Sequence, residues 1–259
     1  MDLLVVGAGA VGRWFAGVAG ADRVAFADVD DAAARAAAER AGGRTAALDG
    51  DESFDAVCLA VPMPVAPEAV ARHAPRAERA LLDVVGTMAP PVAAGRNHAP
   101  DRERLSLHPL FAPNNAPGNV AAVHDAPGPL TDGVRAALDG NGNSVFDTTA
   151  AEHDEAMRTV QAAAHAAVLA YGLAREAVRD EFATPVSRGL DDLVATVTGN
   201  SPRVYRDVQR TFDGASAVAE AARRVATADD EAFERLYREA RETEERHEAG
   251  ADRADGGGR

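Results

Sequence analysis

The stretch Asp2-Leu3-Leu4-Val5-Val6-Gly7-Ala8-Gly9-Ala10-Val11-Gly12 opens the chain and decides its fold. The apolar run Leu3–Val6 is typical of a buried parallel strand, and the glycines lead directly into a predicted helix. This order of strand, glycine loop and helix is typical of a Rossmann phosphate-binding turn. Gly7 would permit the tight turn, Gly9 would let the backbone approach a pyrophosphate, and Gly12 would let the helix pack closely on the strand.

A second predicted strand, Arg23–Ala27, ends at Asp28, which lies 21 residues after Gly7. An acid at this spacing accepts hydrogen bonds from both ribose hydroxyls of an adenosine and repels a 2′-phosphate. Val29 follows Asp28 and no arginine is adjacent, so the sequence favours NAD over NADP. The candidate cofactor-binding residues are Gly7, Gly9, Ala10, Val11, Gly12, Asp28, Val61 and Pro62, the last two following another predicted strand.

Strand-like and helix-like runs alternate up to about Thr148. The predicted strands are Leu3–Val6, Val24–Ala27, Ala56–Ala60, Ala80–Asp83, Leu105–Leu107, Val120–Val123 and Ser144–Phe146, and the predicted helices between them include Val11–Ala19, Asp31–Arg40, Pro67–His73 and Thr131–Leu138. This order predicts an α/β Rossmann domain with a mostly parallel, doubly wound sheet over residues 1–149. The carboxyl ends of its strands would gather the glycine loop, Asp28 and His108 along one edge.

The pattern after Ala150 predicts an all-α domain over residues 150–245, followed by a disordered tail over 246–259. Met157, Val160, Ala164, Val168 and Tyr171 recur at helical spacing and predict one long helix from Ala151 to about Glu181. Further helices are expected over Leu190–Thr198, Pro202–Ala226 and Asp229–Glu245.

The composition narrows the class of partner. The formal net charge is -14, and all 27 basic residues are arginine. An acid-rich chain without lysine suits a cytosol of very high salt, where the Debye length falls to about 3 Å at 1 M; an ordinary acidic protein from a GC-rich genome is the alternative. The charge argues against nucleic acid or an anionic membrane as a partner. Cys58 is the single cysteine, and without a signal peptide or an apolar stretch of about 20 residues we expect a cytoplasmic protein.

The segment Leu107-His108-Pro109-Leu110-Phe111-Ala112-Pro113 carries the main catalytic candidate. Proline fixes its own φ and favours an extended conformation for the residue before it, so His108 has a constrained backbone. A neutral imidazole near pH 7 is suited to accept a substrate proton at hydrogen-bond distance.

With these pieces together, the chain resembles the prephenate dehydrogenase family. Three stretches carry the resemblance: the glycine loop with Asp28, the motif from His108 to Pro113, and Ala151-Glu152-His153-Asp154-Glu155-Ala156-Met157 continuing to Leu173. The resemblance implies that His108 accepts the ring hydroxyl proton while hydride passes to NAD and carbon dioxide leaves. Prephenate would become 4-hydroxyphenylpyruvate, a step of tyrosine biosynthesis. Arogenate or a related cyclohexadienyl compound remains open as substrate.

The resemblance also suggests further site residues. His165, Gln161 on the same predicted helix face, and Arg188 would bind the substrate, whereas His153 suits a helix start. The family's serine beside the catalytic histidine is replaced by Gly86, which leaves Thr87 as the nearby hydroxyl and a second catalytic candidate.

The family's arginine for the ring carboxylate is replaced by Thr196, so Arg188, Arg203 or Arg206 would have to supply the charge. The resemblance further implies a homodimer formed through the helical domain. Two other readings remain: another Rossmann dehydrogenase or imine reductase, disfavoured because those enzymes commonly use a lysine, and an NAD-binding sensor without turnover. No metal site is expected.

Overall fold

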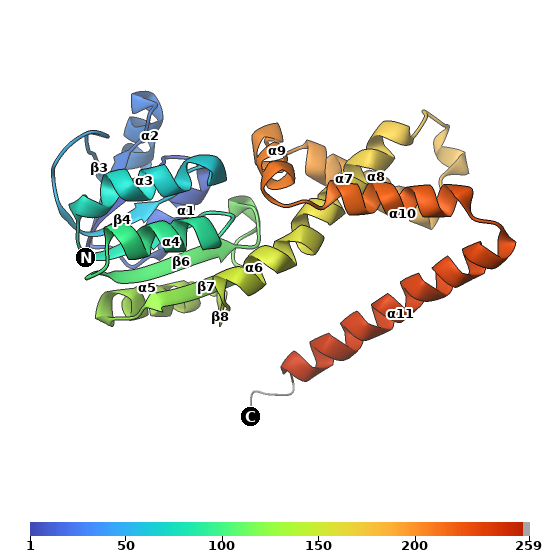
Figure 1. Cartoon of the computed structure of the whole chain (residues 1–259). Helices are drawn as coiled ribbons and strands as arrows, with labels where there is room; N and C mark the ends of the chain where they lie inside the picture. Colours follow the sequence, from blue (N-terminus) through green and yellow to red (C-terminus); the bar gives the residue numbers. More distant parts are fainter. Residues whose placement is uncertain (256–259) are drawn as a thin grey trace.

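The computed structural model describes the backbone of residues 1–255 and the side chains of residues 1–243 and 245. Its N-terminal half is built on one sheet with the order β3-β2-β1-β4-β5-β6-β7-β8 (Figure 1). The strands are β1 Asp2–Val6, β2 Arg23–Ala27, β3 Arg44–Thr45, β4 Phe54–Leu59, β5 Ala77–Asp83, β6 Glu103–Pro109, β7 Asn119–Ala126 and β8 Ser144–Asp147. Neighbouring strands pair in parallel except β6 and β7, which are antiparallel. The predicted α/β Rossmann class with a mostly parallel sheet is confirmed.

The strand order reverses between β1 and β4, since β2 and β3 extend the sheet to one side and β4 to β8 to the other. Ligands of open α/β sheets bind outside the carboxyl ends of the strands at such a reversal. The glycine loop follows β1 at this point, and Ala60-Val61-Pro62 follows β4 directly beside it.

Helices pack on both faces of the sheet. They are α1 Ala10–Val18, α2 Asp31–Ala41, α3 Ala66–His73, α4 Ala89–His98 and α5 Pro129–Gly140. One apolar core contains Phe15 of α1 and Leu138 of α5, and the core on the other face contains Val70 of α3 and Ala94 of α4. Helix α4 was absent from the sequence-based expectation, because Pro90, Pro91 and Gly95 are poor helix formers and its prolines are tolerated only in the first turn.

The C-terminal half is helical, as expected (Figure 1). Helix α6 Ala150–Met157, a π-helical turn Arg158–Ala163 and α7 Ala164–Ala174 follow one another without a break, and then come α8 Pro185–Thr198, α9 Pro202–Thr211, α10 Ala215–Thr227 and α11 Asp230–Asp255. Among the described residues, no helix combines the length and the apolar character that a membrane crossing requires.

Several helix boundaries differ from the prediction. The helix expected over Leu190–Thr198 begins earlier, at Pro185, where the Thr184 hydroxyl caps it. The long helix ends at Ala174 rather than near Glu181, because the exposed segment that follows has no apolar packing to hold it helical. The predicted helix Pro202–Ala226 is broken between α9 and α10, where Gly214 lies so close to Ala162 and Ala163 that a Cβ would be 2.3 Å from the amide nitrogen of Ala163.

Helix α11 continues to Asp255, through much of the stretch expected to be a disordered tail. The rest of that expectation, residues 256–259, lies outside the described residues.

An apolar cluster joins the two halves near the carboxyl edge of the sheet. Met63, Ala66 and Val85 from the N-terminal half pack with residues of the helical half, namely Met157, Ala162, Val208 and Phe212. The predicted boundary at 149/150 coincides with the start of α6, but the two halves share this core.

Candidate active site

The glycine loop after β1 leaves a space that the protein itself does not fill. Gly7 has φ +106°, and a Cβ there would lie 2.2 Å from the carbonyl oxygen of Ala60. A Cβ on Gly12 would lie 2.0 Å from the carbonyl oxygen of Gly7, whereas a Cβ on Gly9 would meet nothing within 4 Å. Gly7 and Gly12 therefore serve the close packing of the chain, and Gly9 borders open space.

The first turn of α1 carries no acidic residue, and its N-cap residue Gly9 makes no side-chain hydrogen bond. The amide groups at a helix N-terminus attract anions when no side chain caps them. Arg13 donates to the carbonyl oxygen of Ala8 at 2.6 Å and so braces the loop from within α1. The uncapped helix end and the open space at Gly9 together fit a dinucleotide pyrophosphate.

Asp28 lies beside the same loop at the end of β2. One carboxylate oxygen accepts from the amide of Ala8 at 2.6 Å, and the other accepts from the amide of Asp30 at 2.9 Å. These bonds hold the half-buried carboxylate at the glycine loop, where a ribose would meet it and a 2′-phosphate would be repelled.

His108 belongs to β6, one residue beyond the predicted strand end. It pairs with Ala121 of the antiparallel strand β7, and Pro109 follows as the last residue of β6. The side chain is buried, with 8% of the residue exposed. Its Nδ1 lies 2.8 Å from Nε2 of His153, a residue of α6 and 45 positions further along the chain.

His153 was expected to be structural, as part of a helix start. The structure does place it in α6, which is capped by the Thr149 hydroxyl, but the side chain lies in the active-site core and contacts His108. The two rings meet edge to face, with centroids 5.0 Å apart. Sequence reasoning missed this contact because local spacing gives no information on pairs so distant along the chain.

Asp154 completes the arrangement. Its Oδ1 lies 2.8 Å from Nδ1 of His153. The same carboxylate accepts from the backbone amides of Met88 at 2.9 Å and Ala89 at 3.0 Å, which begin helix α4. A carboxylate is stabilised at a helix N-terminus by unpaired amides and by the helix dipole. Asp154 therefore fastens α6 to the first turn of α4.

His108, His153 and Asp154 form a row joined by these hydrogen bonds, which we call the histidine row. Burial and hydrogen bonding shift the pKa values of His108 and Asp154 within it. Burial lowers the pKa of His108 to about 3, and the neighbouring His153 adds to this effect, while Asp154 opposes it. Burial acts to raise the pKa of Asp154, but hydrogen bonds from His153, Met88 and Ala89 outweigh it and the pKa is lowered. At neutral pH His108 is an uncharged imidazole and Asp154 is a carboxylate.

Thr87 does not contact His108. Its hydroxyl donates to Oδ2 of Asp154 at 3.2 Å, so its link to His108 runs through Asp154 and His153. The position of the family's serine, Gly86, lies directly beside the imidazole: a Cβ there would be 3.5 Å from Nε2 of His108 and 3.2 Å from Sδ of Met63. Nε2 accordingly faces a place without a side chain, and it has no hydrogen-bond partner among the described residues.

The two other predicted substrate residues on the first long helix lie in and just after its π-helical turn. Gln161 is half-buried within the turn, and His165 follows it in α7. The π turn changes the helical phase, so the four-residue spacing does not place them one above the other as in an α-helix. His165 packs edge to face on Tyr205 of α9, with ring centroids 4.7 Å apart. Its Nδ1 is buried without a hydrogen-bond partner in the described part of the chain.

The three arginine candidates for binding the substrate carboxylate differ in whether a protein carboxylate already pairs with them. Arg203 and Arg206 both lie near the buried carboxylate of Asp207, at 3.9 Å and 3.1 Å, so their charge is partly neutralised. Arg188 is exposed on α8 and pairs with no carboxylate among the described side chains. Thr196 is also exposed, and its hydroxyl donates back to the carbonyl oxygen of Asp192. No contact within the described residues joins Gln161, His165 or Arg188 to His108.

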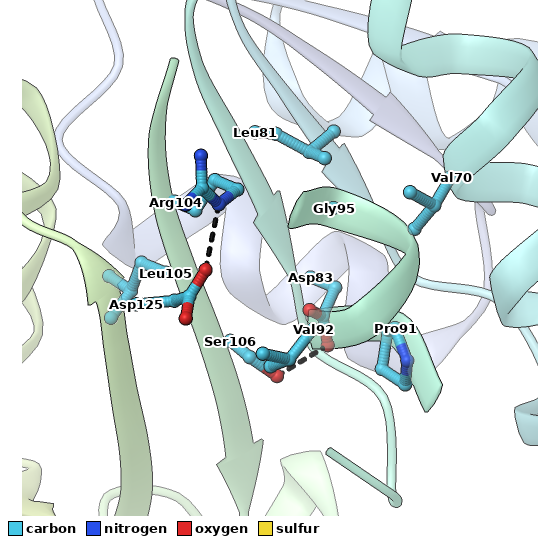
Figure 2. A pocket seen from close by; sticks show the side chains of 10 residues that line it. All are labelled: Val70, Leu81, Asp83, Pro91, Val92, Gly95, Arg104, Leu105, Ser106 and Asp125. Atoms are coloured by element: carbon cyan, nitrogen blue, oxygen red, sulfur yellow. Dashed lines mark hydrogen bonds and ion pairs between the residues drawn. The ribbon is translucent and has the colours of Figure 1, made fainter. Parts of the chain in front are cut away.

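A small cavity on the α3 and α4 face of the sheet is separate from this site. Asp83 and Ser106 face each other across β5 and β6 in its wall, and the Ser106 hydroxyl donates to Asp83 at 3.0 Å (Figure 2). Burial raises the pKa of Asp83 to about 7, although Ser106 and the amide of Val85 partly offset the effect.

The whole chain is similar to known dehydrogenases, although no family model matches it. It is 37% identical over 271 residues to a 4-amino-4-deoxyprephenate dehydrogenase of Streptomyces pristinaespiralis, covering 92% of this chain and 89% of the relative. A prephenate dehydrogenase from A. aeolicus, solved with hydroxyphenyl propionate and NAD+, matches with a TM-score of 0.69 at 17% identity and covers 98% of both chains. A Synechocystis arogenate dehydrogenase matches with a TM-score of 0.62 at 15% identity, covering 95% of this chain and 100% of the other.

An open glycine loop at the sheet reversal and a buried, uncharged histidine at the same edge define a nucleotide-dependent dehydrogenase of the Rossmann-plus-helices class. Within that class, the chain belongs to the prephenate dehydrogenase family, a family of NAD-dependent oxidoreductases. The resemblance inferred from the three sequence stretches is thereby confirmed.

Proposed function

We propose that the chain oxidises and decarboxylates a cyclohexadienyl dicarboxylate of the prephenate type, with NAD as hydride acceptor and His108 as base. The observation that carries this proposal is the buried, uncharged His108, whose Nδ1 is engaged by His153 and whose Nε2 lies beside Gly86, a residue without a side chain. A neutral imidazole with one engaged and one open nitrogen has the form that a general base requires.

The reaction balances with these groups. NAD, when bound, would supply the acceptor for the hydride of ring carbon 4, and the proton of the hydroxyl or amino group on that carbon goes to Nε2 of His108. The bond from ring carbon 1 to its carboxylate breaks, carbon dioxide leaves, and the electron pair of that bond completes the aromatic ring. The proton then returns from Nε2 of His108 to the oxygen or nitrogen on ring carbon 4, which gives a neutral phenol or arylamine. The protein has to hold the base in place and to keep water away from it. The position of His108 in β6 fixes its backbone, and its burial limits its contact with water.

The amino-substituted compound, 4-amino-4-deoxyprephenate, is our first candidate substrate. The relative that acts on it shares 37% identity with nearly the whole chain. Prephenate, with 4-hydroxyphenylpyruvate as product in tyrosine biosynthesis, and arogenate are the alternatives that the His108–Pro113 motif supports.

For the cofactor, we propose that the amides of Gly9, Ala10 and Val11 hold the pyrophosphate of NAD and that Asp28 accepts the ribose hydroxyls. The uncapped start of α1 and the carboxylate held at the loop support this assignment. Gly7 and Gly12 shape the turn, and Val61 with Pro62 would border the cofactor from the end of β4. For the substrate, we retain Gln161, His165 and Arg188 as proposed contacts.

Initial rates with NAD and each of the three compounds test the function. We expect the highest kcat/KM for 4-amino-4-deoxyprephenate, by tenfold or more. A preference for prephenate or arogenate would keep the reaction and change the substrate, whereas absence of NADH formation with all three would overturn the enzyme proposal and favour an NAD-binding sensor.

His108→Asn tests the base. We expect kcat to fall by about 10²–10⁴-fold, the range for loss of a general base. NAD affinity should not change, since the side chain of His108 is hydrogen-bonded to His153 and no hydrogen bond links it to the glycine loop among the described residues. Turnover close to that of the unaltered protein would remove His108 from the mechanism.

We further propose a homodimer formed through the helical half. Helix α7 is rich in apolar residues, yet none of them is buried. Large apolar side chains that remain exposed on this half include Leu173, Phe182, Val186, Phe233 and Tyr237. Exposed apolar area of this kind marks interaction surfaces. Light scattering after gel filtration should give twice the chain mass of 26.8 kDa, and a monomer would contradict the proposal.

A further inference from the structure

We propose that His153, held by Asp154, is a positioning residue that fixes His108 in the tautomer with a free electron pair on Nε2. This inference rests on the proposed role of His108 as base and assigns a function to two residues outside that role. It follows from the direction in which each hydrogen bond of the row can run.

Asp154 determines which atoms donate and which accept in these hydrogen bonds. The carboxylate accepts from two backbone amides and from the Thr87 hydroxyl, and an ionised carboxylate can only accept. Nδ1 of His153, at 2.8 Å, must therefore carry the hydrogen. We propose that His153 carries a single ring hydrogen, on Nδ1, which leaves Nε2 of His153 unprotonated and able to accept.

The donor and acceptor of the His108–His153 hydrogen bond follow in the same way. Nδ1 of His108 lies 2.8 Å from the acceptor Nε2 of His153, so it is Nδ1 that donates. Because His108 is neutral, its Nε2 then bears the free electron pair. This atom faces Gly86, where no side chain competes for it. In the opposite tautomer, the two facing nitrogens would both be acceptors and the contact would be lost.

The row also accommodates the proton after it arrives. When Nε2 takes the substrate proton, His108 becomes a cation that still donates from Nδ1 to His153. His153 continues to donate to Asp154, so no hydrogen bond is broken. The carboxylate, fastened to the first turn of α4, lies at the far end of the row and offsets the new positive charge through His153.

The direct test is nitrogen NMR of the NAD-saturated protein labelled with ¹⁵N-histidine. We expect His108 at neutral pH to be protonated on Nδ1 and unprotonated on Nε2. This readout needs no substrate, so it stands even when none of the three candidate compounds is turned over. A His108 protonated on Nε2 would overturn the inference irrespective of the fate of the proposed function.

Two substitutions at His153 separate positioning from packing. His153→Phe keeps an aromatic ring but removes the acceptor, and we expect a mixed His108 tautomer with kcat reduced by about 10²–10⁴-fold. His153→Gln offers an amide oxygen that can accept from Nδ1 of His108, and it should restore both the tautomer and at least a tenth of kcat. KM and NAD affinity should stay unchanged in both variants.

His73→Gln is the matched control, because His73 is an equally buried histidine that lies on α3 outside this row. It should leave the NMR signals of His108 and kcat unchanged. If His153→Phe keeps the wild-type tautomer and kcat, His153 is structural and the inference fails. If Phe does not yield folded protein, the Gln variant and the wild-type spectrum decide the question.

Discussion

At the scale of single residues, the proposed preference for NAD rests on the carboxylate of Asp28. It is held at the glycine loop by the amide of Ala8, so a 2′-phosphate would meet it at close range. A pair of unit charges at 4 Å repel by about 1 kcal/mol even in water. We expect Asp28→Ser to lower the ratio of kcat/KM for NAD over NADP by about fivefold or more. Asp31→Ser, an exposed acid three positions on, is the control; equal use of both cofactors by the unaltered protein would refute the preference.

The positions of the candidate site residues were predictable where the local sequence pattern determines the strand that carries or precedes them. The glycine loop and Asp28 each follow a strand with a strong apolar pattern, His108 lies near the end of β6, and the sheet brings all three to one edge. The contact of His153 with His108 was not predictable, because it joins β6 and α6, and no local pattern encodes such a pair. Thr87 was identified as a polar group of the site, but its partner, Asp154, lies 67 positions away.

At the scale of elements, β5 and β6 hold a carboxyl group that should make stability depend on pH. The pKa of Asp83 is raised from 3.8 to about 7 by burial, so the folded state keeps a proton that the unfolded chain loses above pH 4. Stability from this group therefore falls as pH rises from 4 to 7. We expect Asp83→Asn to raise Tm at pH 8 by about 2 °C or more, with little gain at pH 4. The same Tm difference at both pH values would contradict the shift.

Helix α8 carries the proposed contact to the ring carboxylate of the substrate. Arg188 is free of carboxylate partners among the described side chains, whereas Arg203 and Arg206 are engaged by Asp207. We expect Arg188→Ala to raise KM by about tenfold or more, since loss of a charge-assisted hydrogen bond costs about 1.5–3 kcal/mol. Arg203→Ala and Arg206→Ala are the comparison. A large rise of KM in either of these alone would move the assignment to that residue.

Most elements were predictable because their apolar spacing is regular, and the differences have local causes. β3 has only two residues, too few for a pattern. The break at Gly214 coincides with its close approach to Ala162 and Ala163 in the π turn of the first long helix. Such packing depends on the fold as a whole and has no counterpart in the propensity of the residues concerned.

At the scale of the whole molecule, the net negative charge predicts that Tm and activity depend on salt concentration. The net charge is -14, and 41 acidic residues face 27 arginines without any lysine. Repulsion among surface carboxylates weakens as the Debye length falls from about 10 Å at 0.1 M to about 3 Å at 1 M. We expect Tm and activity to rise with potassium chloride up to molar concentration. A Tm that does not change over this range would favour an ordinary acidic protein.

The hydrogen bonds between Asp154 and the first turn of α4 limit where chimaeras between this enzyme and its relatives can be joined. The proposed base comes from residues 1–149, but the groups that orient it come from the opening turn of the next half. The junction near residue 150 is therefore a poor place to exchange modules. A chimaera that joins the nucleotide half of one relative to the helical half of another inherits a base and an orienting pair that did not evolve together. Crossovers placed after Met157 keep the histidine row and the amides that anchor it in a single parental segment.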